Sequence, residues 1–264
     1  MTRQRSLPGC FFCSAVIAGG HTNLVDGFSP YGAIGGGRRN IIEGNTFGAA
    51  ILGGSSNVVR EASHYAVVCG GEGNVASGQT AFAAGNWARA LHRGSFVWAD
   101  RFGTPFDSTA DNQFSVRAVG GARFVSGANV FGPTSGVVLA SGGGAWTTLS
   151  DVNAKENFRP VDGKAILDKV AALEVQEWNY KTQDAAVRHL GPTAQDFKAA
   201  FGLGESDTGI TTVDADGVAL AAIQALNGAV SVQGSEVSRL KAENEELKRQ
   251  LGAVLERLRA LEAR

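Results

Sequence analysis

The chain has 264 residues, enough for one to three domains, and carries a formal net charge of −1. This nearly neutral charge gives no reason to expect nucleic acid or an anionic membrane as a partner. No apolar run approaches the roughly eighteen residues that a bilayer span requires, so we expect no membrane-crossing segment. Charge concentrates after residue 149, which separates a glycine-rich front from a charged, helix-favouring back.

The N-terminal residues contain a short cysteine and aromatic cluster. This cluster follows Arg3 and Arg5 and faintly resembles the start of a secretion signal. The apolar residues 15–18, however, keep the phase of the repeat that follows, so we assign them to its first coil and expect no signal peptide. The array therefore begins abruptly. This is typical of a fragment of a longer fibre, or of a chain whose N-terminus joins another protein, such as a baseplate-like assembly.

The three cysteines do not form a disulfide framework. Cys10 and Cys13 make a C-x-x-C pair, but two ligands cannot complete a zinc site. Cys69 occupies a strand position of the repeat, where we expect it in the core. Because the histidines keep no common phase either, we expect no metal and no other cofactor.

A seventeen-residue repeat runs through the first third of the chain. It is marked by two series of identical residues, Gly20, Gly37, Gly54 and Gly71, and Asn23, Asn40, Asn57 and Asn74. Each coil has two short apolar runs separated by glycine and polar corners, which predicts a β-solenoid. Asparagines at one place in each coil can stack their side-chain amides as a ladder. One coil encloses little volume, so association of several chains around an axis would cover the remaining apolar surface.

The repeat resembles the heads of trimeric autotransporter adhesins over residues 14–100. The resemblance implies a homotrimeric, left-handed parallel β-roll in residues 1–100. Residues 101–149 follow as a β-rich connector, in which apolar and polar residues alternate and glycines interrupt the strands. The glycines 142–144 then loosen the chain before Trp146, which is typical of the entry to a new domain.

A serine and a lysine stand five residues apart in the segment that follows. Ser150 needs a base to become a nucleophile, and Lys155 can serve if burial keeps its amine neutral. On one continuous helix, five residues turn by about 500°, which places the two side chains on different faces. They can therefore meet if a turn intervenes, or if the lysine comes from a neighbouring chain.

The segment that begins here resembles the intramolecular chaperone auto-processing domain of phage tail spikes, endosialidase tailspikes and some tail fibres. The S-D-x-x-x-K signature matches at Ser150, Asp151 and Lys155, and two further motifs match at residues 188–197 and 220–226. The resemblance implies that this domain, residues 150–222, acts as a single-turnover, self-cleaving serine endopeptidase after trimerisation. Ser150 is then the nucleophile and Lys155 the general base.

The stereochemistry of attack favours the bond between Leu149 and Ser150. Attack by the Ser150 hydroxyl on the preceding carbonyl passes through a five-membered ring to an ester, whereas attack on its own carbonyl needs a four-membered ring. The bond after Ser150 stays the alternative. Asp151 either orients Lys155 or caps a helix. His189 is expected to fix a loop, and Gln195 to cap a helix or bridge chains.

Residues 223–264 keep heptad phase and predict a coiled coil of about 60 Å. Its core positions form two series: Ile223, Val230, Val237, Asn244, Leu251 and Leu258, and Leu226, Gln233, Leu240, Leu247, Val254 and Leu261. The heptads do not choose between two and three strands; the resemblances choose three.

The expected fold is mainly β followed by α. The leading hypothesis is a homotrimeric tail-fibre or adhesin-like protein on a phage-tail-like particle, virion or bacterial surface. Its C-terminal chaperone directs trimer folding and then releases itself. The alternative is a non-catalytic trimeric surface adhesin that keeps this domain as a permanent clasp. The receptor or glycan bound by the head is not identified by the sequence.

Overall fold

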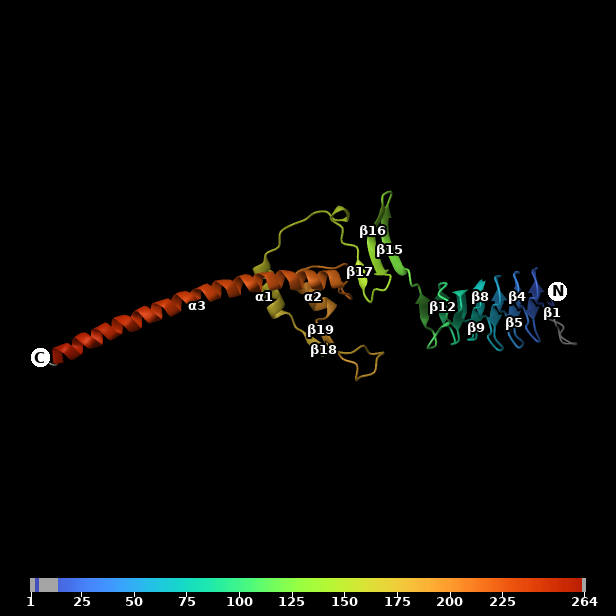
Figure 1. Cartoon of the computed structure of the whole chain (residues 1–264), viewed down its shortest axis with the longest axis horizontal. Coiled ribbons are helices and arrows are strands. Elements are labelled where there is room, and N and C mark those ends of the chain that lie inside the picture. The colour runs from blue at the N-terminus through green and yellow to red at the C-terminus, as the bar shows by residue number, and fades with distance from the viewer. Residues whose placement is uncertain (1–2, 5–13, 263–264) are drawn as a thin grey trace. The chain divides into compact units, whose positions relative to one another are not determined.

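The structure, a computed structural model, describes residues 3–4 and 14–262. The chain divides into two compact units, Met1–Ser150 and Asp151–Arg264. The first unit contains a β-solenoid of about six turns, and the second ends in a long helix, as the sequence predicted (Figure 1).

The solenoid consists of two parallel seven-stranded sheets, and successive strands alternate between them. The first sheet contains β1 (Arg3–Gln4), β3 (Leu24–Val25), β5 (Ile41–Ile42), β7 (Val58–Val59), β9 (Val75–Ala76), β11 (Ala88–Ala90) and β13 (Phe106–Asp107). The second sheet contains β2 (Val16–Ile17), β4 (Ala33–Ile34), β6 (Ala50–Ile51), β8 (Val67–Glu72), β10 (Phe82–Asn86), β12 (Phe96–Ala99) and β14 (Phe114–Arg117). Both sheets continue past residue 100, through β13 and β14.

The coil length is seventeen residues only in the first part of the solenoid. Leu24 pairs with Ile41, as the repeat predicts. Val75 then pairs with Arg89, fourteen residues on. Phe96 pairs with Phe114, eighteen residues on. The last coils therefore keep the sheets but not the sequence period.

The core lies between the two sheets, and each two-residue strand from β3 to β7 contributes one buried side chain to it. Inward side chains such as Ile34, Ile42, Ile51 and Val59 are at most 1% exposed. Burying each contributes roughly 1.5–3 kcal/mol relative to exposure. The two-residue strands are stable because every coil stacks on the next.

The recurring glycines are required by steric fit between coils. Gly37 has φ +84°, and a Cβ at this position would lie 2.1 Å from the carbonyl oxygen of Gly54 in the next coil. Only glycine allows this approach. At Gly53, by contrast, an added Cβ would meet nothing within 4 Å.

The asparagine ladder joins side chains mainly to backbone, which corrects the predicted stacking of amide on amide. The Asn57 amide donates to the carbonyl oxygens of Gly53 (2.9 Å) and Gly71 (3.1 Å). Its Oδ1 accepts the backbone N–H of Asn74 at 3.0 Å. Between described asparagines, one hydrogen bond joins two amides, from Asn74 Nδ2 to Asn57 Oδ1. All four asparagines of the ladder are buried, and their Oδ1 atoms accept buried backbone N–H groups of the next coil.

The outward side of the second sheet, here called the apolar face, is formed mainly by two columns of uncharged side chains. Its two columns are Val16, Ala33, Ala50, Val67, Phe82, Phe96 and Phe114, and Ala18, Gly35, Leu52, Cys69, Ala84, Trp98 and Val116. The outward side of the first sheet is polar by comparison, with ion pairs between Glu43 and Arg60 and between Arg89 and Asp107.

The prediction that Cys69 lies in the core is wrong. Cys69 is exposed and belongs to the apolar face, because Val68 beside it points inward and successive strand residues point to opposite sides. Partial burial raises the pKa of its thiol.

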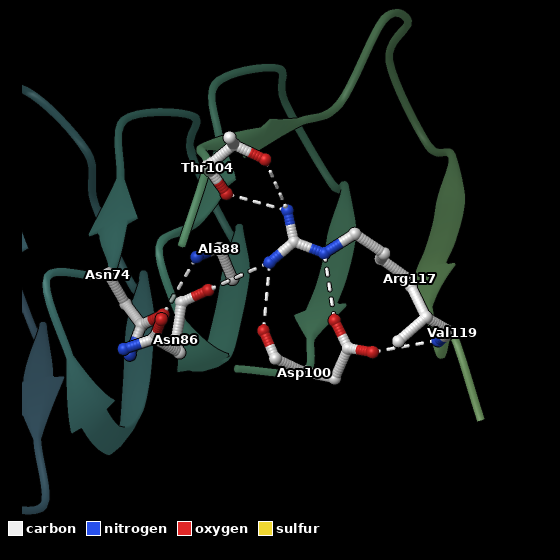
Figure 2. Close-up of polar contacts among 7 residues, drawn as sticks. All are labelled: Asn74, Asn86, Ala88, Asp100, Thr104, Arg117 and Val119. Atoms are coloured by element: carbon white, nitrogen blue, oxygen red, sulfur yellow. Dashed lines mark hydrogen bonds and ion pairs between the residues drawn. The ribbon is translucent and has the colours of Figure 1, made fainter. Parts of the chain in front are cut away.

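An ion pair, here called the end clamp, joins the last coils of the solenoid (Figure 2). Arg117 Nε donates to Asp100 Oδ1 at 2.9 Å, and the other Asp100 oxygen accepts the backbone N–H of Val119 at 2.7 Å. The remaining guanidinium nitrogens donate to the carbonyl oxygens of Thr104 (2.6 Å), Asp100 (2.8 Å) and Asn86 (3.4 Å). One side chain therefore ties together backbone from three coils.

The end clamp is well shielded. The side chains of Arg117 and Asp100 are 13% and 19% exposed, and the guanidinium lies over the rings of Phe102 and Phe106. The Val119 N–H and the Arg117 guanidinium hold the pKa of Asp100 below its ordinary value.

A three-stranded antiparallel sheet completes the first unit. It contains β15 (Gly121–Asn129), β16 (Gly132–Ala140) and β17 (Trp146–Thr148), with β16 in the centre. Phe124 and Trp146 pack edge to face on it, with ring centroids 5.5 Å apart. Trp146 thus anchors the end of the first unit, residues 1–150, which is called the β unit below.

The second unit contains η1 (Val152–Ala154), α1 (Gly163–Ala172), β18 (Gln176–Trp178), β19 (His189–Gly191), α2 (Ala194–Phe201) and α3 (Thr212–Glu262). Its small core includes Phe197, Val218 and Ala222. The start of α1 packs closely on α3, where a Cβ on Gly163 would lie 3.3 Å from the Ala225 side chain.

Helix α3 is 51 residues long, and most of it lies outside that core. The apolar residues of the predicted heptad core, here called the seam, are 43–66% exposed in the single chain. This helix also contains an 18-residue window with a mean hydropathy of 1.3, which corrects the expectation that no segment has the length and composition to cross a membrane. One such helix is weak evidence for a membrane, because an amphipathic helix with an uncovered seam has the same composition.

Candidate functional site

The predicted cleavage position lies at the end of the three-stranded sheet. Leu149 follows β17 and donates its N–H to the carbonyl oxygen of Gly136 at 3.1 Å. Ser150 comes next, is exposed, and is the last residue of the β unit. The predicted scissile bond therefore joins the last residue bonded into this sheet to the residue at the unit boundary.

A single 3-10 turn lies between Ser150 and Lys155. Asp151 caps this turn: its Oδ1 accepts the backbone N–H of Asn153 at 2.9 Å and its side-chain amide at 3.0 Å. The N–H of Lys155 closes the turn on the carbonyl oxygen of Val152 at 3.2 Å. The sequence left open whether Asp151 caps a helix or orients the lysine, and the contacts of its carboxylate are those of a cap.

Lys155 leaves the turn in an extended conformation, with φ −123° and ψ 151°. Residues 151–162 are all exposed in the single chain. A lysine amine acts as a general base where burial keeps it neutral. One chain alone does not provide that burial around Lys155.

His189 belongs to an aromatic cluster in the two-stranded sheet. Its ring lies 4.8 Å from that of Trp178 and 5.5 Å from that of Tyr180. Its Nε2 is 2.9 Å from Gln183 Oε1. These contacts hold the loop between β18 and β19 and give the imidazole a structural environment.

Gln195 lies in the first turn of α2 and is exposed. The N-cap of this helix is instead Thr193, whose hydroxyl accepts the N–H of Asp196 at 3.2 Å. Gln195 therefore does not cap α2, and a role in bridging chains stays a prediction.

Metal-ligating residues do not gather in the described part of the chain. Across residues 14–262, no three or more His, Cys, Asp or Glu side chains form a group that could hold a metal ion. The pair Cys10 and Cys13 lies outside the described residues.

Sequence reasoning missed Gly136, which supports Leu149. The pairing of β16 with β17 sets Val137 opposite Thr148, and the next pair places Gly136 opposite Leu149. An isolated glycine inside a strand often marks a close backbone approach, so this residue carried a usable signal. Its partner was not predictable without the strand register.

Comparison with known protein families matches residues 150–202 to the family described as chaperone of endosialidase, a self-cleaving peptidase-related family. The match confirms the resemblance noted from the sequence for this segment. It begins at Ser150 and ends at Gly202, the residue that caps α2. Comparisons with curated proteins and with solved structures gave no match.

Proposed function

We propose that this chain forms a homotrimeric, fibre-like or adhesin-like protein whose C-terminal unit guides assembly and then cuts itself away at Leu149–Ser150. The observation that carries the proposal is a coincidence of three boundaries. The chaperone-of-endosialidase match begins at Ser150, the β unit ends at Ser150, and the last backbone bond to β16 comes from Leu149. A cut at this bond releases the helical unit and leaves every strand of the β unit in its sheet.

Two uncovered apolar surfaces support self-association. The apolar face runs along the whole second sheet, with Leu52 60% and Phe114 67% exposed. The seam of α3 likewise exposes Leu247 (61%) and Leu251 (59%). Both surfaces repeat along the chain, so parallel copies in register would cover both at once. Three copies, and a left-handed roll, follow from the family resemblances noted in the sequence.

The reaction requires one nucleophile, one base and water. The Ser150 hydroxyl attacks the carbonyl carbon of Leu149, its proton passes to neutral Lys155, and the Ser150 nitrogen leaves as an amine after taking up a proton. Leu149 is then joined to Ser150 Oγ by an ester. Water hydrolyses this ester to the Leu149 carboxylate and the free Ser150 hydroxyl.

Assembly would make this chemistry conditional. Ser150 and Lys155 are exposed in the single chain. Burial of Lys155 by neighbouring chains would favour the neutral amine that a base needs. The C-terminal unit would thus be removed only from chains that have assembled. The released fibre would then be kept folded by its unfolding barrier.

Expression of the full chain tests the proposal. Denaturing electrophoresis and intact-mass measurement should give two fragments, residues 1–149 and 150–264. Ser150→Ala and Lys155→Arg should both stay intact, because arginine keeps the charge but cannot become a neutral base. Lys181→Ala, an exposed lysine of the same unit, is the matched control and should be cut normally.

The alternative is a trimeric adhesin that keeps its C-terminal clasp. An intact wild-type chain in a trimer confirmed by native mass spectrometry would establish this alternative and refute self-cleavage. A new N-terminus at Asp151 would instead move the cut to the bond after Ser150. The surface that carries the fibre, whether a phage-tail-like particle, a virion or a bacterial cell, and any receptor or glycan of the head stay proposals of the same hypothesis.

A further inference from the structure

We infer that the three-stranded sheet of the β unit is the substrate-presenting element of the self-cleavage reaction, and that Gly136 positions Leu149 within it. The inference rests on the proposed function. It adds residues that neither the signature motifs nor the matched segment contain, since β15, β16 and β17 all precede Ser150.

The register of the sheet ends at the bond to be cut. Leu139 pairs with Trp146, Val138 with Thr147 and Val137 with Thr148. Continuing the same register sets Gly136 opposite Leu149, and the N–H of Leu149 indeed donates to the Gly136 oxygen. Leu149 therefore extends β17 by one residue in its pairing with β16, and the Leu149 carbonyl group lies at the end of this extended strand.

Gly136 is suited to this place because it has no side chain. Its φ is +145°, and an added Cβ would lie 2.3 Å from the Phe124 oxygen and 3.0 Å from the Val125 Cα. Val125 pairs with Gly136 from the other side, so Val125, Gly136 and Leu149 form one row across the sheet. Side chains opposite one another in such a row lie on the same face.

The Leu149 side chain lines a pocket on this sheet. Arg123, Val125 and Val138 line it together with Leu149. Leu149 is 39% exposed, whereas Val130 and Phe131, in the turn of the same hairpin, are 92% and 94% exposed. The leucine on the acyl side of the scissile bond is thus held by its N–H, and its side chain is partly covered on this face.

This arrangement has a kinetic consequence. An intramolecular attack is fast when the carbonyl group is held within reach of the nucleophile, and a misplacement of about 1 Å can cost roughly 100-fold in rate. The sheet fixes the acyl side, so the Ser150 hydroxyl has one carbonyl group, that of Leu149, presented at a defined place. Loss of the anchor should slow the cut and loosen the choice between the bonds before and after Ser150.

The structure provides a matched control for the glycine. Gly132 also lies in β16 and also has a positive φ, +134°, but an added Cβ there would meet nothing within 4 Å. Gly132→Ala therefore repeats the backbone penalty without the clash and without contact to Leu149. For the side chain, Leu149→Asp replaces the apolar group that lines the pocket by a charged one, and Leu149→Met keeps an apolar group there.

The experiment follows full chains by pulse-chase in a cell-free translation system. Denaturing gels give the cleavage rate, native mass spectrometry gives the number of chains, and the mass of the C-terminal fragment identifies the bond. We expect Gly136→Ala and Leu149→Asp to assemble but to be cut at least about tenfold more slowly, or at both bonds. Gly132→Ala should be cut at the wild-type rate and only before Ser150, and Leu149→Met should be cut faster than Leu149→Asp.

Cleavage of assembled Gly136→Ala and Leu149→Asp at the wild-type rate and at the wild-type bond would overturn the positioning role while leaving self-cleavage in place. If Gly136→Ala does not assemble, the Leu149→Asp and Leu149→Met pair decides. An uncut wild-type chain refutes the proposed function, and the positioning role with it.

Discussion

The asparagine ladder offers a sharp test of what holds the solenoid together. In Asn57→Ala, the backbone N–H of Asn74 loses its acceptor, which was 3.0 Å away, and the Gly53 oxygen loses the amide donor at 2.9 Å. The Gly71 oxygen keeps a second donor, the N–H of Ser55 at 2.9 Å. One buried group, the Asn74 N–H, and one partly buried group, the Gly53 oxygen, are thus left without these partners.

The size of the effect follows from that count. A buried polar group left unsatisfied costs about 1–3 kcal/mol and a partly buried one costs less, so Asn57→Ala should lower the free energy of unfolding by roughly 1–4 kcal/mol. Asn57→Asp should cost at least as much at neutral pH. It keeps the volume and the acceptor, but it cannot donate to the Gly53 oxygen and it buries a charge. For a domain of ordinary stability, this is a large share of the total.

Urea denaturation of the full chain, followed by far-ultraviolet circular dichroism at one fixed protein concentration, measures the change. The control is Arg38→Ala, which breaks a hydrogen bond to Ser55 at an exposed position, where the coil of Asn57 meets the preceding coil. We expect that change to stay within about 1 kcal/mol. If Asn57→Ala costs no more than Arg38→Ala, the ladder does not stabilise the coils through its buried bonds, and the reasoning is refuted.

Three further predictions concern other parts of the chain. Gly37→Ala should sharply lower the free energy of unfolding in urea, because its Cβ would meet a backbone oxygen at 2.1 Å. Gly53→Ala should change this free energy by no more than about 1 kcal/mol. The pKa of Asp100 is lowered by a backbone N–H bond and by Arg117, so the stabilisation that its carboxylate contributes is present above about pH 4 and disappears as the pH falls through the folded-state pKa. The melting temperature plotted against pH across this range should therefore be flatter for Asp100→Asn than for the wild type. An unchanged pH dependence would contradict the role of the end clamp. Leu247→Asp places a charge in the exposed seam and should reduce the number of chains seen by native mass spectrometry, while retention of the wild-type number would rule the seam out as the assembly surface.

The sequence predicted the elements that repeat or alternate locally. A seventeen-residue period places Leu24 beside Ile41, because equal coils stack in register. The heptad positions from Ile223 onward were sufficient to predict a long helix with an apolar seam, and α3 runs through all of them. The family of residues 150–202 was recognisable from a few spaced residues, including Ser150, because such signatures are local in the chain.

The tertiary structure decided everything that depends on which distant residues meet. The change to coils of fourteen and eighteen residues, at Val75–Arg89 and Phe96–Phe114, has no local marker, because sheet pairing tolerates longer or shorter corners. Cys69 was assigned to the wrong side because strand parity flips every side chain with a shift of one residue.

The end clamp and the support of Leu149 both depend on the register of the sheets. Arg117 binds Asp100 in the last coils, where the register has already left the constant seventeen-residue period, and Gly136 faces Leu149 at a spacing of thirteen residues that belongs to no helix, turn or repeat. A sequence by itself determines such pairs only after the register of its sheets is known. The repeat, the seam and the Ser150 signature were therefore readable from the amino-acid sequence, whereas the clamp that ends the solenoid and the support of the predicted scissile bond came from the fold.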